Sequence, residues 1–296
     1  MTASEPDIPR RMQPSPSQEV ERYLRTGEQD ELSCNWPGDS FLARAQYADA
    51  ALRDALISTV RQRTAHAEVP AALAGIDVGA FTRAKVAPMV RGLFPGHEQE
   101  TVLAVLERSV VFLTPDTIDA VLLTTTWLST VWDLANLYLV SCDAQPLSED
   151  ARLIVGLSAE ATCFVATDYF NAPNRLDDFV VHEAAHVFHN CKRRTVGLSA
   201  TPRREWLLDI DYRKRETFAY ACESYSRILE LGIRSAARRM LLSEIEEGPA
   251  PPDERVDPAE YIDILREAVA SRNGWTRILQ RCSAAQVQRR RAVGAQ

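Results

Sequence analysis

Twelve residues near the middle of the chain limit its possible folds and functions more than any other stretch. Positions 179–190 read Phe-Val-Val-His-Glu-Ala-Ala-His-Val-Phe-His-Asn, and the apolar residues predict a buried helix. His182 and His186 are four positions apart, so a helix places both imidazoles on one side, about 6 Å apart along its axis. That spacing lets both rings bind one metal ion. Ionisable side chains on an apolar helix cost free energy unless they are paired or coordinated.

Glu183 directly follows the first histidine and lies beside both imidazoles on the predicted helix. In the pattern His-Glu-x-x-His, a glutamate at this position can take a proton from a metal-bound water. Zinc lowers the pKa of such a water towards about 7, which makes a hydroxide available at neutral pH. The sequence therefore predicts a zinc site with His182 and His186 as ligands and Glu183 as the catalytic base. The alternative is a core helix with hydrogen-bonded histidines.

The motif resembles that of the zincin metallopeptidases. The resemblance covers residues 179–190 and extends over residues from about 150 to 232, and it implies zinc-dependent hydrolysis of peptide bonds. The metzincin branch continues with Gly-x-x-His after the second histidine, whereas this chain continues with Val-Phe-His-Asn-Cys-Lys. The gluzincin branch takes its third ligand from a glutamate on a later helix, so the resemblance directs the search to residues 202–232.

Three glutamates are candidates for this third ligand. Glu216 begins Glu-Thr-Phe-Ala-Tyr-Ala, which resembles the Glu-Ala-Asn-x-Phe-Ala segment of the ImmA/IrrE-type intracellular zincins, with Thr217 and Phe218 as departures. Glu205 begins Glu-Trp-Leu-Leu-Asp, which resembles thermolysin and the zinc aminopeptidases. We prefer Glu216, because a carboxylate among apolar neighbours needs a partner, whereas Glu205 is expected in a first helical turn. Glu223 shares the face of Glu216 and is either a rival ligand or a partner of one.

Other side chains near the motif are candidates for supporting roles. His189 lies one turn beyond His186 on the same face, so we expect it either beside the site or exposed to solvent. Asp177 and Asp178 precede the motif, where they favour the helix N-terminus. The candidates for stabilising an oxyanion are Tyr212, Tyr220 and Tyr225.

Composition narrows the partners and the compartment. The formal net charge of −7 argues against binding driven by the phosphates of nucleic acid. No apolar leader opens the chain, and its six cysteines include no Cys-x-x-Cys pair, so we expect a cytoplasmic protein with reduced cysteines. Residues 121–140 are long enough to span a bilayer, but Asp133 and Asn136 favour a buried helix of a soluble domain, with Trp127 and Trp132 in the core. The expected partner is a peptide or protein substrate, and neither nucleic acid nor a membrane.

The predicted fold class is mainly α (α+β), with a small sheet beside the motif helix. We expect four segments: a disordered tail over 1–17, a helical region over 18–145, a zincin-like metal-site region over 146–247 and a helical pair over 248–296. Strands are expected at residues 152–157 and 162–168, where an edge strand could align an extended peptide or the pair could be a plain hairpin. Helices are expected from 18 onwards, at 41–63, 81–93, 98–112, from 115 onwards, 121–140, 175–190, from 202 onwards, after 232 to about 247, 258–271 and 275–291.

Three alternatives to a peptidase remain open from the sequence. The segment Glu183-Ala-Ala-His186 also matches the Glu-x-x-His motif of di-iron carboxylate proteins, but that site needs a second such motif on another helix. A zincin-like sensor or regulator would have little general peptidase activity. A purely structural zinc site would be closed by a fourth protein ligand, for which His189 and Cys191 are candidates.

Overall fold

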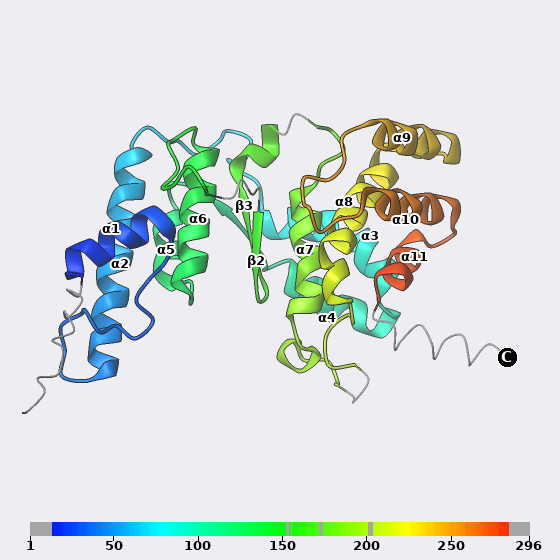
Figure 1. The fold of residues 1–296 in the computed structure, drawn as a ribbon. Helices are drawn as coiled ribbons and strands as arrows, with labels where there is room; N and C mark the ends of the chain where they lie inside the picture. Colours follow the sequence, from blue (N-terminus) through cyan, green and yellow to red (C-terminus); the bar gives the residue numbers. More distant parts are fainter. Residues whose placement is uncertain (1–13, 152–153, 155, 172–173, 201–203, 284–296) are drawn as a thin grey trace, which may run out of the picture. The chain divides into compact units, whose positions relative to one another are not determined.

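The structure is a computed structural model that describes residues 14–151, 154, 156–171, 174–200 and 204–283 (Figure 1). The chain divides into two compact units. Unit 1 comprises residues 1–68 and 115–153, and unit 2 comprises residues 69–114 and 154–296. Across the described residues, α-helices predominate and a small sheet is present, which confirms the predicted α+β fold class. The helical region expected over 18–145 is shared between the two units.

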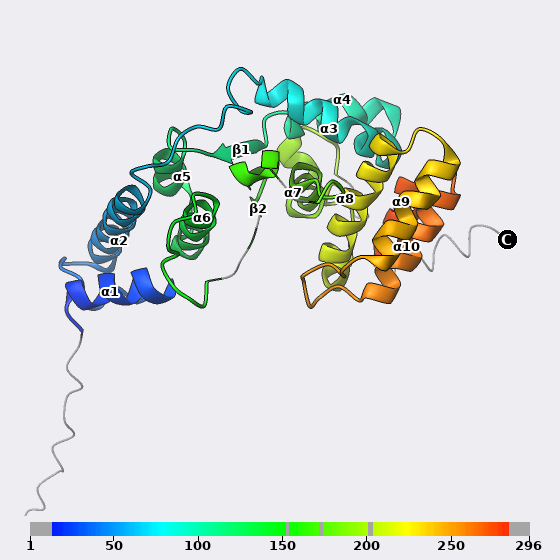
Figure 2. The same cartoon turned by 90° about the horizontal axis from the view of Figure 1, so that it is seen from above.

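The regular elements in the described part of unit 1 are all helices. Its helices are α1 (Pro16–Thr26), α2 (Phe41–Arg63), α5 (Ile118–Thr124) and α6 (Leu128–Ser141) (Figure 2). The hydroxyl of buried Tyr23 on α1 donates to the carbonyl of Leu128 on α6, at 2.7 Å. The guanidinium of Arg53 on α2 donates to the carbonyl of Leu122 on α5, at 2.6 Å. The second bond satisfies a carbonyl in the last turn of α5, which has no partner within that helix.

Helix α1 begins earlier than expected. It starts at Pro16 instead of Gln18, because Ser15 and Gln18 form a reciprocal capping box in which each side chain accepts the other's backbone N–H. The end of the tail that was expected to be disordered, at Pro16 and Ser17, is therefore helical. Residues 1–13 lie outside the described part of the chain.

The prediction of one continuous helix over residues 121–140 was wrong. The hydroxyls of Thr124 and Thr125 donate to the carbonyls of Ala120 and Val121, and Thr125 adopts an extended backbone that ends α5. Trp127 lies in the break and is 71% exposed, contrary to expectation, whereas Trp132 is buried as predicted. The segment after Thr114 was also expected to be helical at once, but a turn precedes the start of α5 at Ile118. In the described chain, no helix combines the length and apolar character needed to cross a bilayer.

Unit 2 contains a three-stranded sheet in the order β1-β3-β2. Strand β1 (Val110–Leu113) pairs in parallel with β3 (Thr162–Ala166), and β2 (Gly156–Ala159) pairs with β3 in antiparallel orientation.

The prediction of a helix over 98–112 was wrong at its C-terminal end. Helix α4 (Gly96–Leu106) ends before this segment. The run Val-Val-Phe-Leu suits a buried strand as well as a helix, and it forms β1 because its backbone can hydrogen-bond to β3.

Helix α7 (Phe179–Asn190) packs between the sheet and other helices of unit 2. Helix α7 contacts β2 and β3, α3 (Val78–Leu93) and α8 (Arg215–Leu231). Two further helices, α10 and α11, pack on α8, and α9 packs on both α8 and α10 (Figure 2). These three are α9 (Ser235–Glu247), α10 (Pro258–Ala270) and α11 (Gly274–Cys282), and short 3-10 turns lie at η1 (Thr167–Asn171), η2 (Arg193–Val196) and η3 (Tyr212–Lys214).

Two predicted helix starts around the motif need correction. Helix α7 begins at Phe179 instead of residue 175, because the fully buried carboxylate of Asp178 caps it by accepting the N–H of Val181 and is itself held by Lys85, at 3.0 Å. The helix expected from residue 202 is absent over residues 204–211. That segment instead forms bridges and turns, including a bridge between Trp206 and Lys192. Residues 201–203 and 284–296 lie outside the described part of the chain.

Candidate metal centre

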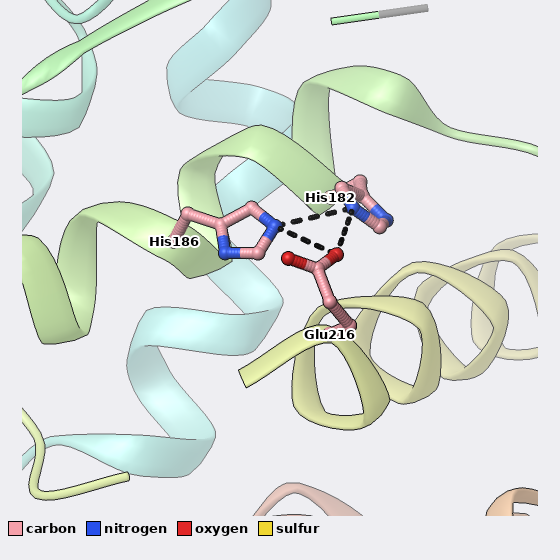
Figure 3. Close-up of side chains that lie close together, drawn as sticks. All are labelled: His182, His186 and Glu216. Carbon is pink, nitrogen blue, oxygen red and sulfur yellow. Dashed lines mark hydrogen bonds and ion pairs between the residues drawn. The ribbon is translucent and has the colours of Figure 1, made fainter. Parts of the chain in front are cut away.

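Three side chains from two helices converge at one point. His182 and His186 are carried by α7, and Glu216 is carried by the first turn of α8, which lies beside it (Figure 3). The two imidazoles are 8% exposed, so most of each ring is removed from water. The described residues contain one group of this kind that fits a metal ion, and it consists of these three side chains. The structure therefore brings together the ligand set predicted from the sequence.

The distances within the group suit zinc. The two Nε2 atoms of His182 and His186 are 3.2 Å apart, and Oε2 of Glu216 lies 3.5 Å from the second and 3.8 Å from the first. Ligand atoms at about 2.0–2.1 Å from a tetrahedral zinc ion are about 3.3 Å from one another. The nitrogen, nitrogen and oxygen donors also match the set that zinc prefers in catalytic sites. We conclude that the donor atoms and distances of these three residues fit zinc.

Glu223 orients the first histidine. Its Oε2 lies 3.0 Å from Nδ1 of His182, and its Oε1 accepts the backbone N–H of Asp178 at 2.7 Å. A carboxylate on Nδ1 fixes the proton there and leaves Nε2, which faces His186 and Glu216, available to a metal ion, as the partners of metal-binding histidines commonly do. In this structure Glu223 therefore contacts a candidate ligand and is not part of the three-residue group, which favours the second of the two roles left open by the sequence.

His189 has the corresponding place beside the second histidine. Its Nε2 lies 3.3 Å from Nδ1 of His186, and the side chain is buried, so of the two positions expected for it the structure shows the one beside the site. Burial and the neighbouring His186 lower the pKa of His189 to about 3, which keeps its ring neutral and able to accept a hydrogen bond at Nε2. Its Nδ1 then carries the proton, and this buried atom has no partner among the described residues.

Glu183 is buried on α7 beside the first histidine of the group. It is 5% exposed, and its Oε2 has no hydrogen-bond partner among the described residues. Strand β2 approaches it so closely that a Cβ atom added to Gly156 would lie 2.6 Å from Oε1. Burial raises the pKa of Glu183, and the imidazoles of His186 and His182 oppose that change. A buried carboxyl with a raised pKa and an unused oxygen is suited to proton transfer.

The charges of the group favour a cation at its centre. Burial alone would lower the pKa of His182, but the carboxylates of Glu216 and Glu223 outweigh it and raise that pKa to about 10. Burial would likewise raise the pKa of Glu216, but His182 and His186 hold it well below its usual range. Several carboxylates thus share a water-poor site and need positive charge, which a divalent ion supplies.

The other candidates lie away from the group. Glu205 is 59% exposed and pairs with Lys192 at 2.7 Å, a contact that lowers its pKa. Cys191 is buried beyond the end of α7 and is not part of the three-residue group. Of the tyrosines, Tyr220 lies edge-on to His182 with ring centroids 4.5 Å apart, Tyr212 is 79% exposed, and Tyr225 packs against Trp275.

The assignment of the third ligand leads to a paired test. We expect Glu216→Gln to weaken zinc binding by more than about 100-fold, because it removes a ligand and not only the partner of one. Glu205→Gln, at an exposed ion pair, should leave zinc affinity within about twofold. Competition with a chromophoric chelator measures both. Thermal unfolding of the metal-free proteins separates lost coordination from lost folding. Loss of zinc in the Glu205 variant alone would show that the ligand was wrongly assigned.

Two residues of the site were not found by sequence reasoning. Gly156 leaves the space that Glu183 occupies, and the pattern of the predicted strand contains nothing that marks it. Arg255, in the loop between α9 and α10, places Nη2 at 3.1 Å from Oε1 of Glu216, and no residue of that loop was predicted to belong to the site. The Asp-Glu-Arg sequence at residues 253–255 contains no helical or strand periodicity that would predict its contact with the site. Only the packing of α9 and α10 on α8 brings it to the site.

In comparisons with known proteins, no family model, curated protein or solved structure matches this chain. The argument for a function therefore depends on the geometry of the site.

Proposed function

We propose that this protein is a zinc-dependent metallopeptidase that hydrolyses peptide bonds in the cytoplasm. The observation that supports the proposal most is the convergence of His182, His186 and Glu216 within ligand distance of one another, beside a buried glutamate that none of them uses as a partner. Three protein ligands leave one position of a tetrahedral ion for water, as catalytic zinc sites do and structural sites do not. The resemblance of the motif to the zincins points the same way.

The residues of the chain divide the work. Bound zinc would supply a water of lowered pKa and polarise the carbonyl of the substrate. Glu183 takes the proton of that water and delivers it to the leaving nitrogen. Glu223 and His189 hold the two imidazoles in the orientation that presents Nε2 to the ion. Strand β2 is an edge strand of the sheet and adjoins Glu183, so its free side can pair with an extended peptide.

A metal-exchange experiment with a peptide library tests the proposal. We expect the protein treated with a chelator to cleave nothing, and stoichiometric zinc to restore cleavage of a subset of peptides detected by mass spectrometry, because the fourth position then holds water. Zinc-loaded Glu183→Gln serves as the control for contaminating peptidases. A protein that binds one zinc ion and cleaves no peptide or protein substrate would instead be a sensor or a structural zinc protein.

A further inference from the structure

The loop between α9 and α10 places a guanidinium against the candidate metal ligand on α8. Nη2 of Arg255 lies 3.1 Å from Oε1 of Glu216, whereas the other oxygen, Oε2, faces the two Nε2 atoms of the histidine pair. The two oxygens of one carboxylate thus have separate neighbours. An oxygen held by an arginine is less available to a metal ion than the free oxygen beside it.

The arginine is itself held in place. The carboxylate of Asp253 accepts from Nε of Arg255 at 2.9 Å, from Nη2 at 2.5 Å and from the backbone N–H of the same residue at 2.8 Å. A planar guanidinium bound in this forked manner has little freedom to rotate. The next residue, Val256, is 4% exposed and packs in the main core of unit 2, and Asp257 caps α10. The chain is therefore fixed directly after Arg255, and the side chain of Arg255 is held by Asp253.

We propose that Asp253 and Arg255 form a clamp that positions Glu216 to bind zinc through Oε2 alone, and that this clamp strengthens zinc binding. The guanidinium by itself would repel a divalent cation, but the carboxylate of Asp253 offsets its charge. Because the charges of Arg255 and Asp253 offset each other, the main effect of the clamp is to orient the carboxylate of Glu216. Hydrogen-bond partners of metal ligands commonly contribute about 10- to 100-fold in metal affinity. The proposal rests on the zinc site of the proposed function and does not require that the site hydrolyse peptides.

Zinc affinity of matched arginine variants tests the clamp. We expect Arg255→Gln to bind zinc about tenfold more weakly than the unchanged protein, measured by competition with a chromophoric chelator. Arg266→Gln is the control, because Arg266 is similarly exposed and also contacts two carboxylates, those of Glu246 and Asp263 on α9 and α10. Its affinity should stay within about twofold. Asp253→Asn should also weaken zinc binding, but less than Arg255→Gln does. The double variant should lose less zinc-binding free energy than the sum of the two single losses, because both residues act through one contact with Glu216.

The outcomes are distinguishable. Unchanged or tighter zinc binding by Arg255→Gln would overturn the clamp, and so would an equal loss in the Arg266 control or a matching drop in the unfolding temperature of the metal-free variant. Zinc binding by the unchanged protein without hydrolysis would overturn the proposed peptidase function and leave the clamp standing. If the unchanged protein binds no zinc, both proposals are wrong.

Discussion

Zinc content is expected to fall from about one ion per chain to near zero when either histidine of the motif is replaced, in His182→Ala or His186→Ala. Each substitution removes one of three protein ligands, and the two that remain cannot hold the ion in a tetrahedral site. Elemental analysis after removal of free metal measures the zinc content directly.

A third histidine variant provides the control for this experiment. His97→Ala changes a histidine whose side chain is 80% exposed and belongs to no metal-binding group of the described residues, so its zinc content should not change. Circular dichroism of the metal-free proteins checks that the motif variants still fold. If His182→Ala and His186→Ala both fold and both keep their full zinc content, the assignment of these histidines as zinc ligands is wrong.

The second large effect concerns the rate of hydrolysis. In Glu183→Gln, zinc should stay bound while kcat falls by about 100-fold or more, because an amide of the same shape cannot accept the proton that the carboxylate transfers. Glu183 does not belong to the group of three ligands, and its Oε2 has no partner among the described residues. The measurements are kcat on the best substrate of the peptide library and zinc content of the same sample.

An exposed glutamate provides the control for Glu183→Gln. Glu205→Gln alters a side chain paired with Lys192 at the surface and should retain both zinc and activity. A zinc-loaded Glu183→Gln with unchanged kcat would exclude Glu183 as the base and transfer that role to another residue. Loss of zinc from this variant would instead make Glu183 a ligand.

The core of the site could be predicted because it depends on local periodicity. The four-residue spacing of His182 and His186 places both rings on one face of any helix, and the apolar residues between them predict that the helix is buried. Glu216 was preferred because a carboxylate in an apolar helix needs a partner, and the structure places it with the histidines. The role of Glu223 stayed open, because its position on a helix face does not show whether its carboxylate contacts the metal or the Nδ1 atom of a histidine.

The parts that were missed depend on contacts between distant segments. The four residues from Val110 to Leu113 suit a helix or a strand, and only the partner β3, more than fifty residues later, decides between them. Glu205 was expected at a helix N-terminus, but the segment after residue 203 pairs with Lys192 instead, through a backbone bridge from Trp206 and the ion pair of Glu205. Arg255 and Gly156 matter through one contact each, to Glu216 and Glu183, and such contacts leave no pattern in the sequence.

The pairing of β1 with β3 has a consequence for the order in which the protein folds. Val110 is paired with Cys163, and the segment 115–153 between them belongs to unit 1. During synthesis, β1 leaves the ribosome well before its partner, and closing so long a loop is slow compared with forming local helices. Both motif histidines and Glu216 come later still. Uptake of zinc would therefore be among the last events of folding, and metal content would report how many chains have completed the process.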